Sequence, residues 1–279
     1  MSTKKFEMKG KCMKRLLRTS LKQAIRVIVI VGIVFGIYNT IHPIVNVSSS
    51  HYNISQIQEN THTYENNGFD DWSEEIAPNY VRALGVAHVD HTVENGAIEY
   101  GDIDSLGRTT WAAGRITYPM VEKSAGWREP FASDADDISG WKNPNTGKSN
   151  NGKVTVDLYN NKTYSGYFYN RSHLIADSLG GIAERKNLIC GTRMQNVGAN
   201  DGQGGMAYIE TIVRNYLYKN KNGVVYYAAT PIYCENEIVP RVVIVDAKSD
   251  DGEINMRVEV FNAQKGYTID YTTGAWAKS

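Results

Sequence analysis

The sequence has little of what would assign it to a specialised class of protein. Only three cysteines occur in 279 residues, and no CxxC pair is present, which excludes a disulfide-rich scaffold and disfavours a cysteine-bound zinc site. Cys190 and Cys234 either form a disulfide or remain free thiols. Nothing indicates collagen, a coiled coil or general disorder, and with 42% hydrophobic residues the chain can bury one substantial core.

The chain also lacks an overall charge, because 30 Lys and Arg balance 30 Asp and Glu. The first 26 residues hold nine basic residues and one acidic residue, which leaves 21 basic against 29 acidic residues, a net charge of −8, in the remainder. The basic excess typical of a nucleic-acid-binding protein is therefore missing from the totals. Binding would need local clustering, and we expect the fold to gather around a cleft some of Arg108, Arg115, Arg128, Arg171, Arg185, Lys186 and Arg193, which are otherwise solvated surface charges.

The apolar run that follows the basic leader is short. Residues 27–38 are strongly apolar, fewer than the roughly twenty that a membrane span needs, but no charged residue occurs from 27 to 58. The pattern predicts a signal or anchor helix within residues 1–45, followed by a polar linker over 46–77. No clear small-x-small cleavage site follows the run. This favours an uncleaved anchor in the cytoplasmic membrane, with the rest of the chain outside, over secretion.

Two segments carry most of the information about function. Residues 169–180 read YNRSHLIADSLG, and residues 187–196 read NLICGTRMQN. They place one histidine and two asparagines where a nuclease that uses a single metal ion needs them. The histidine would activate water. An amide oxygen would hold a hard cation, which keeps several waters and takes further ligands from the substrate phosphate.

The tetrapeptide of residues 170–173 resembles the Asp-Arg-Gly-His signature of the DNA/RNA non-specific endonucleases, whose shared core is the ββα-metal fold. Further blocks occur in the family's order, which makes the resemblance specific. The chain is similar to the secreted streptococcal DNases and the membrane-bound DNA-entry nucleases of that family, over roughly residues 78–250. The supporting blocks are Asp104–Arg108, Arg128–Pro130, Gly204–Glu210 and Thr230–Tyr233.

The resemblance implies a role for each matching residue. His173 would be the general base, and Asn196 would bind Mg²⁺ directly, with Mn²⁺ able to substitute. Asn187 would be a supporting amide, and Glu210 would hold metal-bound water. Arg171 would be either structural or phosphate-binding. The implied reaction is hydrolysis of DNA, with RNA as a second candidate, to 5′-phosphate ends, and the sequence indicates no obligate protein partner.

Two departures from the family pattern leave simpler roles open. Asn170 replaces the leading Asp, which puts in doubt any role that needs a carboxylate, and Ser172 replaces Gly, which mainly restricts the backbone. The two asparagines that match the family could be turn or cap residues, and Asn200 is a rival metal ligand. Glu210 could lie on a solvated helix face.

Local patterns are consistent with this placement. Residues 164–174 alternate aromatic and polar side chains and predict a strand, and the apolar run 187–192 predicts a second one. From Met206 onward, apolar residues recur at helical spacing, which predicts a helix with Ile209, Val213, Tyr216 and Leu217 on its buried face. The ligand Asn196 would lie just before this helix or on a short preceding one. We expect an α+β domain over residues 78–279, with a central antiparallel sheet and a ββα-metal motif.

Two other functions stay open on the sequence alone. His88-Val-Asp-His91 could mark a different metal-dependent hydrolase, although a third ligand is not identifiable. The stretch 224–246, rich in β-forming residues, could belong to a cell-surface binding module without catalysis.

Overall fold

The computed structural model describes residues 71–126 and 128–279, so the basic leader, the expected anchor helix and most of the expected linker lie outside the described residues. None of the helices in these two ranges is long and apolar enough to span a membrane. Packing starts at the first described residues. Trp72 stacks on Tyr80 at 4.4 Å and donates its indole hydrogen to the carbonyl oxygen of Ala77 at 2.8 Å. The packed domain thus begins a few residues before position 78.

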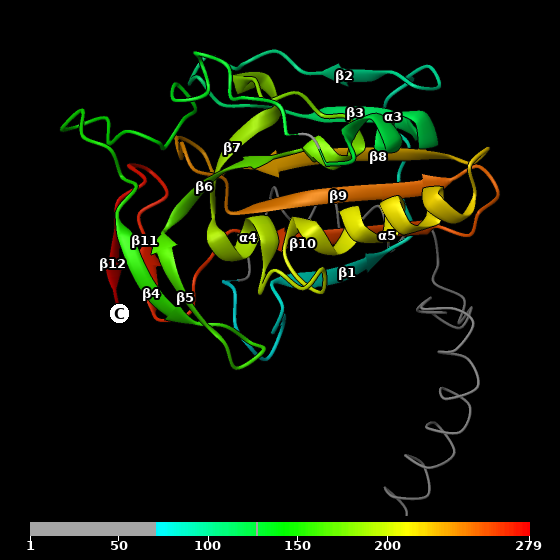
Figure 1. The fold of residues 1–279 in the computed structure, drawn as a ribbon. Coiled ribbons are helices and arrows are strands. Elements are labelled where there is room, and N and C mark those ends of the chain that lie inside the picture. Colours follow the sequence, from blue (N-terminus) through cyan, green and yellow to red (C-terminus); the bar gives the residue numbers. More distant parts are fainter. Residues whose placement is uncertain (1–70, 127) are drawn as a thin grey trace, which may run out of the picture. The chain divides into compact units, whose positions relative to one another are not determined.

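A six-stranded antiparallel sheet, in the order β1-β10-β9-β8-β3-β2, forms the centre of the domain (Figure 1). Val and Ala dominate its central strands, as expected for a pleated surface with a buried face. The stretch 224–246, weighed above as part of a binding module, supplies strand β8 and the start of β9 at the middle of this sheet. The strands are β1 (Val81–Gly85), β2 (Ile98–Tyr100), β3 (Ala112–Thr117), β8 (Val224–Ile232), β9 (Val242–Ser249) and β10 (Asn255–Phe261).

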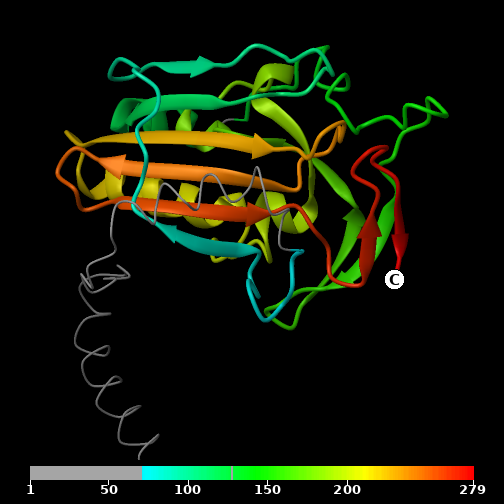
Figure 2. The ribbon, with the colours of Figure 1, turned by 180° about the vertical axis from the view of Figure 1, so that it is seen from behind.

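Two helices, α3 (Tyr118–Ser124) and α5 (Met206–Lys219), cover one face of the sheet (Figure 1), whereas the view from behind shows the strands in front of them (Figure 2). The five apolar residues predicted to share one face of α5 are all buried in the main core. Burial of each large aliphatic side chain contributes about 1.5–3 kcal/mol. The core therefore fixes α5, and with it Glu210, relative to the sheet.

The predicted strand over residues 164–174 is two strands. The chain bends at Phe168, which is buried in a second core and stacks on Trp276 at 4.4 Å. The break separates a hairpin from the two-stranded ribbon β6–β7, after which α4 and α5 complete the expected ββα arrangement. The remaining elements are β4 (Lys153–Asp157), β5 (Thr163–Tyr167), β6 (Tyr169–His173), η1 (Asp177–Leu179), η2 (Arg185–Asn187), β7 (Leu188–Thr192), α4 (Arg193–Val197), β11 (Tyr267–Ile269) and β12 (Trp276–Lys278).

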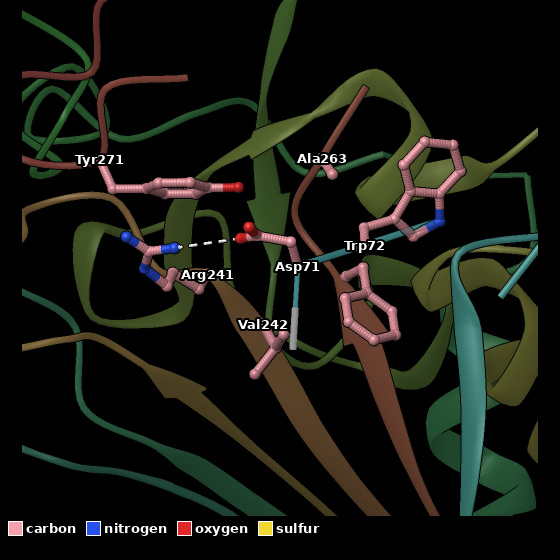
Figure 3. A pocket seen from close by; sticks show the side chains of 7 residues that line it. Asp71, Trp72, Arg241, Val242, Ala263 and Tyr271 are labelled. Atoms are coloured by element: carbon pink, nitrogen blue, oxygen red, sulfur yellow. Dashed lines mark ion pairs between the residues drawn. The ribbon is translucent and has the colours of Figure 1, made fainter. Parts of the chain in front are cut away.

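A cavity of about 10 Å³, room for one water molecule, lies where residues 71–72 cross the start of β9 (Figure 3). Its wall is an ion pair at 3.6 Å between Asp71 and Arg241. The Arg241 guanidinium also lies over the ring of Tyr271 at 4.6 Å and donates hydrogen bonds to Glu237. These contacts tie the first described residues to the sheet.

Among the described residues, neither Cys190 and Cys234 nor the close histidine pair forms a metal site. Cys190 and Cys234 are free thiols, the second of the two alternatives above. The backbone amide of His88 donates to Asp246 at 2.7 Å, and the imidazole of His91 stacks on Trp111 at 3.9 Å. Within the described ranges no three His, Cys, Asp or Glu side chains are grouped to hold a metal ion. The alternative of a different metal-dependent hydrolase at His88 and His91 therefore lacks the ligands that it needs.

Candidate active site

Strand β6 and helix α4 bring together three polar side chains, two from the strand and one from the helix. The Nδ2 of Asn196 donates to the Oδ1 of Asn170 at 3.0 Å. The Oγ of Ser172 donates to the Oδ1 of Asn196 at 3.2 Å. Asn196 is thus on the short preceding helix, one of the two positions expected for it, and lies beside the residue that precedes His173.

Two residues at the end of β7 allow α4 to fold back so closely. The Oγ1 of Thr192 accepts a hydrogen bond at 3.0 Å from the amide of Gln195, an N-cap that starts the helix directly after the strand. Gly191 leaves the space that the helix needs, because a Cβ there would lie 2.1 Å from the Oε1 of Gln195. The turn therefore fixes where Asn196 lies over β6.

Asn170, which stands where the family signature has Asp, holds the amide of Asn196. Its Oδ1 accepts the hydrogen bond from Asn196, and an amide oxygen accepts such a bond as a carboxylate oxygen does. This contact orients the amide of Asn196. The departure from the family signature at position 170 thus removes a negative charge but leaves the orienting contact in place.

His173 ends β6 in an enclosed position. Its imidazole stacks on Phe131 at 5.9 Å with an interplanar angle of 29°, and its Nε2 is buried without a hydrogen-bond partner in the described structure. Burial lowers the pKa of His173 to about 4; the nearby Asp177 opposes this shift and Arg128 adds to it. The imidazole is consequently neutral at pH 7 and able to accept a proton. Phe131 gives no signal in the sequence, because it lies in a loop without periodicity.

Asn187 is fully buried and uses its amide on the backbone. Its Oδ1 accepts from the amide of Ile175 at 3.0 Å, and its Nδ2 donates to the carbonyl oxygens of Ile175 and Ile182 at 2.9 and 2.8 Å. The side chain thereby fixes the loop that follows His173. These three bonds give the Asn187 side chain a structural role.

Arg171 is enclosed by aromatic rings and paired with a carboxylate. Its guanidinium lies over Phe131 at 4.9 Å and over Trp141 at 4.6 Å, and its Nε donates to Asp136 at 2.8 Å. Phe131 therefore stacks on Arg171 and on His173, two residues apart on the same side of β6. The arrangement favours the structural role of Arg171 over the phosphate-binding one.

Glu210 lies one turn into α5 and is half-buried among apolar side chains. Burial raises its pKa to about 8, and Arg214, four residues later on the same helix, partly opposes this shift. Arg214 itself donates to the hydroxyls of Ser178 and Thr211, both at 3.1 Å. The i, i+4 spacing of Arg214 from Glu210 is the one signal in the sequence for this contact.

The donor set fits a hard divalent cation. Asn196 offers an amide oxygen, and the Glu210 carboxylate is held in surroundings that disfavour its charge, which a cation would compensate. Asn200, the rival ligand, is exposed and has a left-handed backbone (φ 60°), and its amide donates to the carbonyl oxygen of Val197 at 2.8 Å. This is the geometry of an ordinary turn residue.

Of the basic residues expected around the cleft, Arg185 donates to the carbonyl oxygen of Gly107 at 2.9 Å, and the other six divide into two groups. Four of them pair with a carboxylate, which neutralises their charge: Arg108 with Asp104, Arg115 with Asp250, Arg171 with Asp136 and Lys186 with Glu184. Arg128 influences His173, and Arg193 starts the helix that carries Asn196. Most of the basic residues expected to cluster around the cleft are therefore neutralised by a neighbouring carboxylate, and few remain to bind a nucleic acid.

Comparisons with known proteins match this chain to nucleases. The family model of the DNA/RNA non-specific endonucleases matches residues 79–276. A deoxyribonuclease of Streptococcus dysgalactiae subsp. equisimilis is 36% identical over 197 residues, which cover 63% of this chain and 59% of that protein's length. The structure of Sda1 nuclease with bound zinc ion is 39% identical with a TM-score of 0.70, over 75% of this chain and 100% of that one. NucA from Streptococcus agalactiae, with magnesium ion bound, shares the fold at 22% identity, with a TM-score of 0.56 over 84% of this chain and 98% of that one.

Proposed function

Since this chain belongs to the DNA/RNA non-specific endonuclease family, we propose that it is a Mg²⁺-dependent endonuclease that hydrolyses the phosphodiester bonds of DNA. RNA is a second candidate substrate, and the products would carry 5′-phosphate ends. One observation carries the proposal. Strand β6 and helix α4 set Asn196 in contact with Ser172, directly beside His173. Asn196 is thereby held one residue along β6 from the general base.

His173 is the general base of the proposed reaction. The neutral imidazole takes a proton from a water molecule, which then attacks phosphorus while the bond from phosphorus to the 3′-oxygen breaks and that oxygen takes up a proton from solvent. Two features support this assignment, namely the lowered pKa and the buried Nε2 that lacks a partner. Phe131 holds the ring in place by stacking on it.

Asn196 would hold a divalent cation through its amide oxygen, and Glu210 would hold water around it. When bound, such an ion stabilises negative charge on the phosphate oxygens. Mg²⁺ suits this site because the donors are oxygens, whereas zinc sites are built mostly from histidine and cysteine. The structure of Sda1 nuclease, which has a bound zinc ion, supports the proposal that this chain binds a divalent metal. We expect Mn²⁺ to substitute.

Two of the residues assigned to catalysis by resemblance support the site in this proposal. Asn187 fixes the loop after His173 through three hydrogen bonds to the backbone. Arg171 holds Phe131 against His173. Both are positioning residues, because neither side chain is free to reach the substrate.

The proposed location of the enzyme is the outer side of the cytoplasmic membrane, with secretion as the alternative. It rests on the basic leader and the apolar run, which lie outside the described residues. Fractionation of cells tests it: we expect the Mg²⁺-dependent activity in the membrane fraction. Activity in the culture medium alone would indicate secretion.

Cleavage of a supercoiled plasmid tests the proposed function. The wild-type chain should nick and linearise the plasmid with Mg²⁺ and leave it intact with EDTA, and the His173→Ala variant should leave it intact in both. A parallel assay with a structured RNA compares the two candidate substrates. Intact plasmid with wild-type protein and Mg²⁺ would instead favour a binding module.

A further inference from the structure

Arg193 lies next to the proposed metal ligand. It is the first residue of α4, three positions before Asn196, and residues three apart on a helix are neighbours on its surface, about 5–6 Å apart at Cβ. Its backbone amide donates to the carbonyl oxygen of Phe168 at 2.9 Å. This bond ties the start of the helix to the junction of β5 and β6, so Arg193 lies between the proposed metal ligand and the β4–β5 hairpin.

The charge of Arg193 has no carboxylate partner in the described structure. Its Nη1 is buried without a hydrogen-bond partner, whereas Arg171, on the neighbouring strand, is paired with Asp136. Burial lowers the pKa of Arg193 from its ordinary value, but an arginine stays charged. An unpaired buried charge costs stability, and a negatively charged group of a substrate would compensate it.

The guanidinium of Arg193 is held in a defined plane. It lies over the ring of Tyr164 at 4.9 Å. The Oη of Tyr164 donates to the carbonyl oxygen of Tyr167 at 3.0 Å, and the ring crosses Gly166, where a Cβ would come within 2.3 Å of that hydroxyl. A guanidinium stacked on a fixed ring keeps its N–H edge for a planar, bidentate partner such as a phosphate.

We propose that Arg193, stacked on Tyr164, binds a backbone phosphate of the substrate strand that neighbours the phosphate being cleaved. This inference rests on the proposed function, because a nucleic acid at the His173 site would place its next phosphate beside α4. The strand would leave the site toward the β4–β5 hairpin. Tyr164 positions the arginine and Gly166 leaves room for Tyr164.

Binding measured apart from cleavage tests the inference. Fluorescence anisotropy of a labelled DNA duplex, in EDTA and over a range of salt concentrations, would compare the His173→Ala protein with the same protein carrying Arg193→Gln. We expect the second change to weaken binding about tenfold and to reduce the slope of log K against log salt by about one. Arg193→Lys should keep the salt slope and lose part of the affinity, because it keeps the charge but not the planar fork.

A matched control separates this effect from a general change in charge. Arg115→Gln removes an arginine that is paired with Asp250 and hydrogen-bonded to Asn95, and it should leave both the affinity and the salt slope unchanged. Melting temperatures of all variants report on the fold. In the cleaving protein, Arg193→Gln should raise KM about tenfold and lower kcat little.

The outcomes distinguish the two proposals. If Arg193→Gln lowers the melting temperature but leaves affinity and salt slope equal to those of Arg115→Gln, the arginine only packs on Tyr164 and the inference is wrong. That result is compatible with a cleaving wild-type enzyme. If the wild-type chain fails to cleave the plasmid and the His173→Ala protein does not bind DNA, the proposed function fails, and this inference with it.

Discussion

The two ends of strand β7 use the same side chain in opposite ways. Before the strand, Asn187 is buried and all its hydrogen bonds go to backbone atoms. Beyond it, the side chain of Asn196 bonds within the described residues to the side chains of Asn170 and Ser172 and to no backbone atom. Backbone partners fix a loop permanently, whereas side-chain partners can rotate and release an amide oxygen to a cation. In the proposed function, Asn187 before the strand stabilises a loop, and Asn196 after the strand binds the cation.

The difference also explains why residue type alone was ambiguous. Both asparagines match the family pattern, and both could be turn or cap residues on the sequence. Their hydrogen-bond partners separate them. Asn187 is fully buried and uses both its donors and one acceptor position on the backbone, so its side chain is not available to substrate or metal.

Of the two asparagines that flank β7, Asn196 should have the larger effect on the cleavage rate. Asn196→Ala should lower the cleavage rate at least about 100-fold and raise the Mg²⁺ concentration needed for half-maximal activity, while the melting temperature stays near that of wild type. Rates measured across a Mg²⁺ titration check this. Asn200→Ala is the matched control and should behave as wild type, so a larger loss in that variant would move the metal site.

A substitution of Asn187, before β7, should lower the stability of the fold instead. Asn187→Leu leaves buried backbone groups of Ile175 and Ile182 without partners, which costs about 1–3 kcal/mol for each such group. Denaturant unfolding should therefore show a loss of about 3 kcal/mol or more, and the folded fraction should keep its Mg²⁺ requirement. A stable Asn187→Leu protein without activity would assign chemistry to this end as well.

The enclosed position of His173 predicts a pH dependence of stability. Its pKa is about 4 in the folded chain and about 6.5 when unfolded, so the unfolded state alone takes up a proton as pH falls from 6.5 to 4. The free energy of unfolding should drop by about 2 kcal/mol between pH 7 and pH 5 from this group. His173→Gln should remove that part of the drop. An equal drop in both proteins would mean that the imidazole is solvated.

The smallest effect is expected for the stack that holds Phe131. Arg171→Met removes two cation–π contacts and one exposed ion pair, together about 1 kcal/mol, and should lower kcat severalfold with little change in KM. Asp136→Asn should have the same effect to a lesser degree. A rise in KM without a change in kcat would show that Arg171 binds substrate.

The sequence predicted those parts of the fold that depend on local pattern. The helix from Met206 and its buried face are confirmed, as are the strand over 188–192 and the antiparallel sheet. The break at Phe168 was missed because aromatic alternation continues through it, and only a second core shows why the chain bends there. Phe131 was missed as well, because a loop residue gains its stacking partners through tertiary contacts alone.

The sequence indicated candidate residues for the site but not the contacts between them. Resemblance indicated His173, Asn196 and Glu210, whereas the contact of Asn196 with Asn170 depends on how closely α4 folds back over β6. The sequence also could not show that Arg193 lacks a carboxylate partner in the described structure. Whether a charge is paired depends on which carboxylates the fold brings near it.

Chemical rescue of the general base tests the central claim most directly. With Mg²⁺ present, His173→Gly should lose about 10²–10⁴-fold in cleavage rate, and added imidazole should restore part of that rate in proportion to its neutral form. Asn196→Ala should not respond to imidazole, since its defect is in holding the cation. A His173→Gly protein that cleaves plasmid at the wild-type rate would contradict the assignment of His173 as the base.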